Sequence, residues 1–148
     1  MDAAFSELAD GELRLVFLSR RSGDEALERA PSYFFNMQNR FTDEIMGEIE
    51  LRGGNYRGIL LYSGHIGYEV YPAFRGKHYA ERASRLLFPV ARRLGLNPLW
   101  ITCNPDNPAS RRTCERLGGV LVEIVDVPRN TALYARGDHQ KCRYRVDL

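Results

Sequence analysis

A short stretch near the middle of the chain places a strand pattern, a tight basic turn and a helix pattern in immediate succession. Residues 66–71 read IGYEVY, residues 75–80 read RGKHYA, and a helical repeat follows at once. The first backbone N–H groups of a helix lack partners within the helix, and the helix dipole leaves that end positive. This order therefore predicts an anion site at the turn, with Arg75 and Lys77 beside it. A basic loop before a surface helix would give the same pattern, so the turn alone leaves both interpretations open.

The size and charge of the chain fit one globular domain. It has 148 residues, of which 44% are hydrophobic and 27% charged, and these values are ordinary for a domain with one core. We expect a single domain over residues 1–148. The formal net charge is only +2, so we expect no nucleic-acid partner. Local clustering of basic residues near the turn and the next helix favours a local anion site: Arg75, Lys77, Arg82, Arg85, Arg111, Arg112 and Arg116.

No segment predicts a membrane span, an export signal or a metal site. No run approaches the roughly 18 apolar residues that a spanning helix needs, and residues 1–4 lack the basic and apolar segments of a signal peptide. Cys103, Cys114 and Cys142 fit neither a disulfide framework nor zinc spacing. We therefore expect reduced thiols, no metal, no membrane partner and a cytoplasmic location.

Alternating and helical patterns predict a mixed α/β domain with one central sheet. A helix pattern follows the turn, with apolar residues at spacings of three and four from Ala80 to Leu94, and Pro89 predicts a kink in it. A second helix has Asn107 as N-cap and Pro108 at its first position. Residues 22–30 could hold a short helix, and strand patterns cover residues 12–21, 31–39, 45–52, 64–71, 98–104, 120–127 and 141–148.

With these elements placed, the chain resembles the GNAT family of N-acetyltransferases over roughly residues 64–122. The pyrophosphate loop of that family reads Arg/Gln-x-x-Gly-x-Gly/Ala, and residues 75–80 stand in its place. The family continues with a strand, an Asn and a helix that ends in Leu-Gly. Residues 100–103, Asn107, Ser110, Leu117 and Gly118 match that continuation here. The resemblance implies the family's α+β fold, a mixed central β-sheet with flanking helices.

The resemblance also implies acetyl-CoA as co-substrate and an amine as acceptor. In this family the strand before the loop splays from its neighbour, and free backbone N–H groups meet the thioester and the pantetheine arm. The coenzyme-binding residues implied here are Val70, Tyr71, Arg75, Gly76, Lys77, His78, Tyr79, Ala80, Asn107 and Ser110. For Asn107, the N-cap alone would also explain its presence.

Two residues depart from the family pattern. His78 replaces the usual glycine, where a side chain could crowd the phosphates if φ is positive; histidine tolerates that conformation better than β-branched residues, and its ring could instead add a phosphate contact. Cys114 stands seven residues after Asn107, where many relatives carry a tyrosine thought to protonate the leaving thiolate. A dedicated acid, a covalent intermediate and an ordinary core cysteine all stay open for Cys114.

The chemistry needs a base more than an acid. A primary amine titrates near ~10.4, so freeing it at pH 7 costs about 4–5 kcal/mol, whereas a thiol titrates near ~8.5 and leaves readily. The candidate bases are His65, Glu69 and Glu48. His65 is preferred because histidine titrates near neutral pH, and Glu69 comes next; a structural hydrogen bond for His65 and a solvent-facing Glu69 are the alternatives.

We therefore expect an acetyl-CoA-dependent N-acetyltransferase that transfers the acetyl group directly within a ternary complex. A non-catalytic CoA-binding or sensor module with the same fold is the alternative, and nucleic-acid binding through the arginines is a third. The acceptor stays open among a protein N-terminus, a lysine, a polyamine, an aminoglycoside and other small amines. The two terminal strands could support a homodimer.

Overall fold

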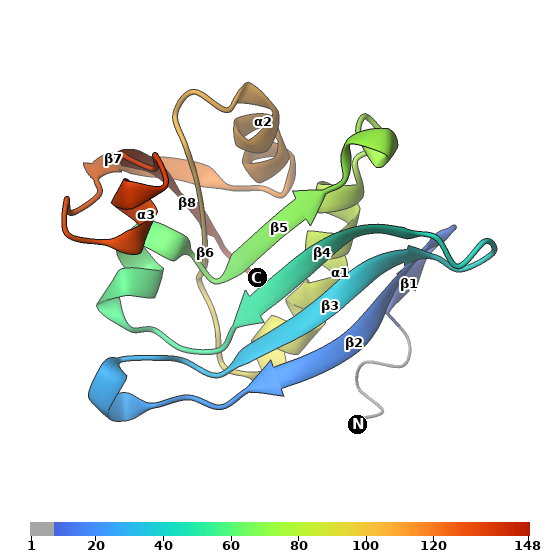
Figure 1. Ribbon diagram of the computed structural model, residues 1–148, viewed down its shortest axis with the longest axis horizontal. Helices are drawn as coiled ribbons and strands as arrows, with labels where there is room; N and C mark the ends of the chain where they lie inside the picture. The colour runs from blue at the N-terminus through green and yellow to red at the C-terminus, as the bar shows by residue number, and fades with distance from the viewer. Residues whose placement is uncertain (1–7) are drawn as a thin grey trace.

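The computed structural model describes residues 8–148 and shows an α+β fold with two antiparallel sheets (Figure 1). Residues 1–4, whose composition predicts no signal peptide, lie outside the described residues. The first sheet has the strand order β1-β2-β3-β4-β5, with β1 (Ala9–Asp10), β2 (Leu13–Arg21), β3 (Ser32–Asn39), β4 (Ile45–Arg52) and β5 (Ile66–Val70). The second has the order β6-β8-β7, with β6 (Leu99–Cys103), β7 (Val120–Asp126) and β8 (Gln140–Val146).

The helices cover these sheets unequally. Helix α1 (Tyr79–Arg93) lies behind the first sheet in Figure 1, and α2 (Pro108–Arg116) lies beside the end of β5. The short elements are η2 (Glu25–Leu27), η3 (Ile59–Ser63), η4 (Pro72–Phe74) and α3 (Ala132–Ala135). No helix within residues 8–148 combines the length and the apolar character that crossing a bilayer requires.

The core forms between α1 and one face of the first sheet. Because side chains alternate across a strand, β3 buries Phe35 and Met37 while β4 buries Ile49 and Leu51 on that face. Helix α1 contributes an apolar stripe that includes Leu87, which is fully buried. The opposite face of the first sheet carries polar residues, Glu48 of β4 and Glu69 of β5 among them.

The predicted fold class is confirmed, and the predicted single sheet is divided in two. No ladder pairs β5 with β6 in the described part of the chain. The two strands meet at their starts, where the His65 N–H donates to the Trp100 carbonyl at 2.7 Å. Gly64 permits this approach, since its φ is +72° and a Cβ there would lie 3.0 Å from the Trp100 oxygen. From this junction the strands separate, so the sheet opens next to the basic turn.

The sequence placed the long elements well and the short ones poorly. The predicted strand at 45–52 is β4, and the helix after the basic turn runs from Tyr79 to Arg93 with Pro89 inside it. The region 22–30, where a short helix was predicted as possible, holds the three-residue 3₁₀ helix η2 and an isolated bridge between Asp24 and Arg29. No sequence pattern indicated η3, η4 or α3, because turns of three to five residues are too short to show a hydrophobic period.

Candidate functional site

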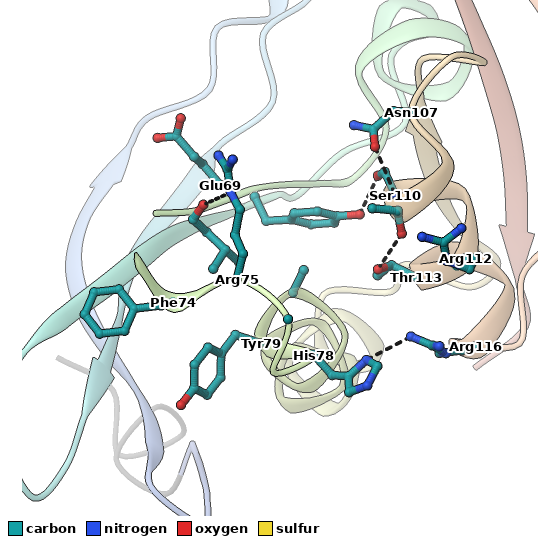
Figure 2. Close-up of a pocket in the computed structure, with 15 residues that line it drawn as sticks. Glu69, Phe74, Arg75, His78, Tyr79, Asn107, Ser110, Arg112, Thr113 and Arg116 are labelled. Atoms are coloured by element: carbon teal, nitrogen blue, oxygen red, sulfur yellow. Dashed lines mark hydrogen bonds between the residues drawn. The ribbon is translucent and has the colours of Figure 1, made fainter. Parts of the chain in front are cut away.

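A cleft of about 590 Å³ opens between the end of β5 and α2 (Figure 2). One wall is formed by β5, η4 and the first turn of α1, and the other by α2. The cleft therefore lies where the two sheets separate. Its lining residues are Tyr68, Glu69, Val70, Phe74, Arg75, Gly76, His78, Tyr79, Ala80, Asn107, Ala109, Ser110, Arg112, Thr113 and Arg116.

The first turn of α1 meets the cleft with an uncapped N-terminus. His78 is the N-cap, with φ of 61° in the left-handed region, and its side chain does not cap the helix. The imidazole instead lies toward α2, where the Arg116 Nη1–H donates to His78 Nδ1 at 2.8 Å (Figure 2). The amides of the first turn are thus left for another acceptor, and an anion is the natural one.

Three arginines at the cleft have no carboxylate partner within residues 8–148, and three others do not belong to it. Arg75, Arg112 and Arg116 line the cleft. By contrast, Arg82 pairs with Asp10 and Glu12, Arg85 pairs with Glu81, and Arg111 donates to the Tyr144 hydroxyl. Six of the seven basic residues seen in the sequence therefore split into three that face the cleft and three that fix other parts of the fold, while Lys77 lines no part of the cleft.

The backbone of β5 offers a hydrogen-bond donor to the cleft. The Tyr71 N–H donates to the Met46 carbonyl at 2.9 Å, on the β4 side. Successive N–H groups of a strand point to opposite sides, so the Val70 N–H points toward the cleft. The Val70 carbonyl accepts from Arg75 Nε at 3.0 Å, which holds the Arg75 side chain across the cleft opening (Figure 2).

Tyr68 places a hydroxyl inside the cleft and was not among the site residues predicted from the sequence. Its oxygen lies 2.6 Å from the Ser110 Oγ, and Asn107 Oδ1 in turn accepts from the Ser110 backbone N–H at 3.1 Å (Figure 2). Burial raises the pKa of Tyr68 to about 12, so the phenol keeps its proton. The period of two along β5 puts Tyr68 on the same strand face as Val70, which was a signal available in the sequence.

Glu69 is the carboxylate that lines the cleft, and Glu48 is its neighbour. The two residues are directly opposite in the β4–β5 ladder, and no ion pair joins either of them to a described residue. Burial raises the pKa of the nearby Tyr71 phenol, and the charges of Glu48 and Glu69 raise it further. Like charges directly opposite on a sheet are unfavourable, so this pair favours a cationic group between or beside them.

Comparison with known proteins shows which family this chain belongs to. The sequence profile described as the acetyltransferase (GNAT) domain matches residues 10–120. The chain belongs to the GNAT acetyltransferase family. A search of curated protein sequences found no match.

Solved structures of acetyltransferases share the fold. They include the GNAT-family acetyltransferase from Bacillus anthracis, with 20% identity, TM-score 0.59, and coverage of 77% of this chain and 65% of that chain. The ribosomal-protein-S5-alanine acetyltransferase from Vibrio fischeri has 18% identity, TM-score 0.62, and coverage of 78% and 61%. The microcin C7 self-immunity acetyltransferase MccE, solved with acetyl-CoA and AMP, has 18% identity, TM-score 0.60, and coverage of 79% and 61%. This chain therefore spans less than two thirds of the length of these three proteins.

The structure brings together most of the coenzyme-binding residues that GNAT membership implied. Eight of the ten line the cleft: Val70, Arg75, Gly76, His78, Tyr79, Ala80, Asn107 and Ser110. Tyr71 and Lys77 lie outside its lining. Tyr79 is 3% exposed and its hydroxyl donates to Glu12 at 2.7 Å, so its side chain anchors α1 to the N-terminal part of the sheet. Asn107 is confirmed as the N-cap of α2.

The geometry does not support His65 as the catalytic base. The residue is fully buried and does not line the cleft. Its Nδ1 accepts from the Trp100 N–H at 2.9 Å, so Nε2 carries the proton and donates to Asn55 Oδ1 at 2.9 Å. Burial lowers the pKa of His65 to about 4. This neutral imidazole joins β5 to β6 at the point where the sheets separate.

Cys114 likewise lies outside the cleft. It is fully buried between α2 and the second sheet, and the structure records it, Cys103 and Cys142 as free thiols. A hydrogen bond with Cys103, together with burial, raises the pKa of the Cys114 thiol. A buried, protonated thiol away from the lining suits a core residue better than a nucleophile or an acid.

Proposed function

We propose that this GNAT protein is an N-acetyltransferase that moves an acetyl group from acetyl-CoA to a primary amine within a ternary complex. The observation that carries the proposal is the uncapped start of α1 at the mouth of a cleft that runs along the splayed end of β5. The start of α1 supplies backbone amides for a diphosphate. The splayed end of β5 exposes the Val70 N–H to the position where a thioester would lie.

The residues at hand fit this coenzyme. The amides of the first turn of α1, with Gly76 in the left-handed region at φ of 89°, would receive the diphosphate. Arg75, Arg112 and Arg116 supply positive charge around it. The pantetheine arm would follow β5 between Val70 and Ser110.

Three groups of the protein act on the reactants in the transfer step. Glu69 accepts the proton of the ammonium acceptor, directly or through water, and the freed amine nitrogen forms a bond to the thioester carbon. The Val70 N–H stabilises the oxygen that gains charge. The carbon–sulfur bond then breaks, and its electron pair stays on sulfur. The Tyr68 hydroxyl is placed to protonate the departing thiolate, and the second proton of the attacking nitrogen, released as the amide forms, returns through water to the Tyr68 oxygen.

The experiment that tests the proposal measures CoA release across a panel of amines, with isothermal titration of acetyl-CoA alongside. Binding with turnover on at least one amine supports it. Binding of CoA without thiol release on any amine class would favour the non-catalytic CoA-binding module instead. Retention of a radiolabelled acetyl group on the protein, with acetyl-CoA alone, would contradict direct transfer.

Peptide N-termini are the first acceptors to assay. One structural relative is named as an acetyltransferase of alanine in ribosomal protein S5, which is a protein amine. We propose the same broad class here. The single domain over residues 1–148, the cytoplasmic location and the homodimer stay predictions, and a measured molar mass in solution tests the last of these.

A further inference from the structure

A second cavity, of about 370 Å³, lies at the other end of the first sheet from the coenzyme cleft. The tip of the β2–β3 hairpin, η3 and the segment around α3 enclose it; in Figure 1 these three gather on the left of the view. Its lining includes Arg21, Arg29 and Arg52, and Glu28 is the acidic residue among the described lining. We call it the arginine cavity.

The arginine cavity has more positive than negative charge. Arg52 pairs with Glu50 at 3.2 Å, and Arg21 reaches the same carboxylate only at 3.9 Å. Arg29 has no ion pair within the part of the chain that the structure describes. Arg21 Nη2 also donates to the Oγ of Ser32, which is 1% exposed and belongs to the lining. One carboxylate is thus shared by two guanidinium groups while a third has none.

Arg52 is fixed as the inner wall of this cavity. Its Nη1 donates to the Ser63 and Gly64 carbonyls at 3.1 and 3.0 Å. Burial lowers the pKa of Arg52, and the charges of Arg21 and Arg136 lower it further against the opposing effect of Glu50. A negative group entering the cavity would relieve this crowding of positive charge.

Arg52 also connects the cavity to the reaction centre. A Cβ on Gly67 would lie 2.9 Å from Arg52 Nη2, so the guanidinium covers Gly67 on β5. Gly67 and Glu69 are on the same strand face, roughly 7 Å apart by the strand rise. A path along this face therefore leads from the proposed base to the arginines within a few residues of extended peptide.

We propose that the arginine cavity binds an acidic side chain of the acceptor, so that the substrate is a peptide N-terminus with Asp or Glu among its second to fourth residues. This rests on the proposed function. The amine would lie at Glu69, next to the thioester, while the carboxylate is held by Arg21 and Arg29 with Arg52 behind them. The cavity then selects acceptors by charge at a distance from the chemistry.

The test compares two peptides that differ only in charge, Ala-Asp-Glu-Ala-Gly-Tyr and Ala-Asn-Gln-Ala-Gly-Tyr, as acetyl acceptors. A charge-assisted hydrogen bond predicts about a tenfold higher kcat/KM for the acidic peptide. In the double variant R21Q/R29Q the ratio of the two values falls to within about twofold. The control R92Q removes an exposed arginine of α1 that lines neither cavity and keeps the ratio. R29Q alone, which changes one exposed side chain, serves if the double variant does not fold.

Two outcomes overturn the proposal. One is an equal kcat/KM for the two peptides, even where inorganic phosphate binds the cavity, and the other is a ratio that the variants leave unchanged. Competition by phosphate against the acidic peptide alone, lost in R21Q/R29Q, supports it. If neither peptide is acetylated, the proposed function fails separately. Titration calorimetry then tests peptide binding at the arginine cavity. Binding of the acidic peptide by the parent protein that R21Q/R29Q abolishes supports the site. No binding by the parent protein, or unchanged binding by the variant, overturns it.

Discussion

The coenzyme cleft and the arginine cavity are built in different ways. The cleft is formed largely by two continuous segments, residues 68–80 and 107–116, whose order along the chain is itself the motif. The arginine cavity draws on the β2–β3 hairpin, the end of β4, η3 and the α3 segment, which no motif joins. A site made by backbone amides at a helix start is specified by residues that are neighbours in the sequence. A site made by side chains from four segments forms only when the chain folds.

The largest effect is expected from Glu69, the proposed base at the end of the cleft where the acetyl group is transferred. Glu69→Gln should lower kcat about 10²- to 10⁴-fold, because it removes the proposed proton acceptor, while acetyl-CoA affinity by calorimetry stays the same. Glu48→Gln is the matched control, since Glu48 is opposite Glu69 in the ladder but outside the lining. An E69Q enzyme with the turnover of the parent would remove Glu69 from the mechanism.

A second prediction concerns the junction that opens the cleft. His65 is neutral in the fold, with its pKa lowered to about 4 against about 6.5 in the unfolded chain. The unfolded state therefore binds more protons between these values, so stability is present above pH 6.5 and is lost as pH falls toward 4. At about 1.36 kcal/mol per pH unit this loss amounts to roughly 2–3 kcal/mol.

Urea unfolding at pH 7 and pH 4.5 measures this effect. His65→Gln should flatten the decline between the two pH values and lower stability at pH 7. The variant H139Q, at an exposed histidine stacked on Tyr134, should keep the decline of the parent. An unchanged slope for H65Q would mean that other groups cause the acid loss.

Arg116 tests the phosphate end of the cleft. Arg116→Gln should weaken acetyl-CoA binding about tenfold, because one charge-assisted contact at an exposed site is lost, and should reduce the salt dependence of binding. R92Q provides the neutralised control on α1. If R116Q binds as tightly as the parent at low salt, the His78–Arg116 pair is a surface contact without a role in the coenzyme site.

Tyr68 should have a smaller effect, because the thiolate leaves readily without help. Tyr68→Phe keeps the ring in place and removes the hydroxyl that meets Ser110. We expect kcat to fall about threefold to tenfold with little change in KM for acetyl-CoA. The loss of kcat in Y68F should be smaller with an activated thioester, whose thiol is more acidic, than with acetyl-CoA. A larger loss with the activated thioester would contradict the acid role.

Asn107 should show the smallest effect, and on stability. Asn107→Ala removes the side-chain acceptor of the Ser110 N–H, so thermal unfolding should report a loss of about 1 kcal/mol. Asn107→Ser retains a neutral acceptor at the cap and should recover most of that loss. If acetyl-CoA affinity also falls in N107S, Asn107 contacts the coenzyme as well as capping α2.

Local sequence determined the parts of this protein that depend on neighbouring residues. The period of two in β3 and β4, the Asn107 cap with Pro108 after it, and the turn that runs into α1 are all short-range features, because strand faces, caps and helix starts are fixed within a few residues. The eight coenzyme-site residues that the cleft brings together follow from the same local order.

Tertiary structure alone decided which titratable groups face the cleft. His65 and Glu69 share a strand pattern, yet Trp100 and Asn55 bind both His65 nitrogens while Glu69 lines the cleft. Arg82 and Arg116 come from the two basic helix patterns of the sequence, yet Asp10 and Glu12 neutralise only Arg82. Trp100 lies 35 residues from His65, and Asp10 and Glu12 lie 72 and 70 residues from Arg82. Burial and pairing, which set charge and reactivity, are properties of such distant contacts.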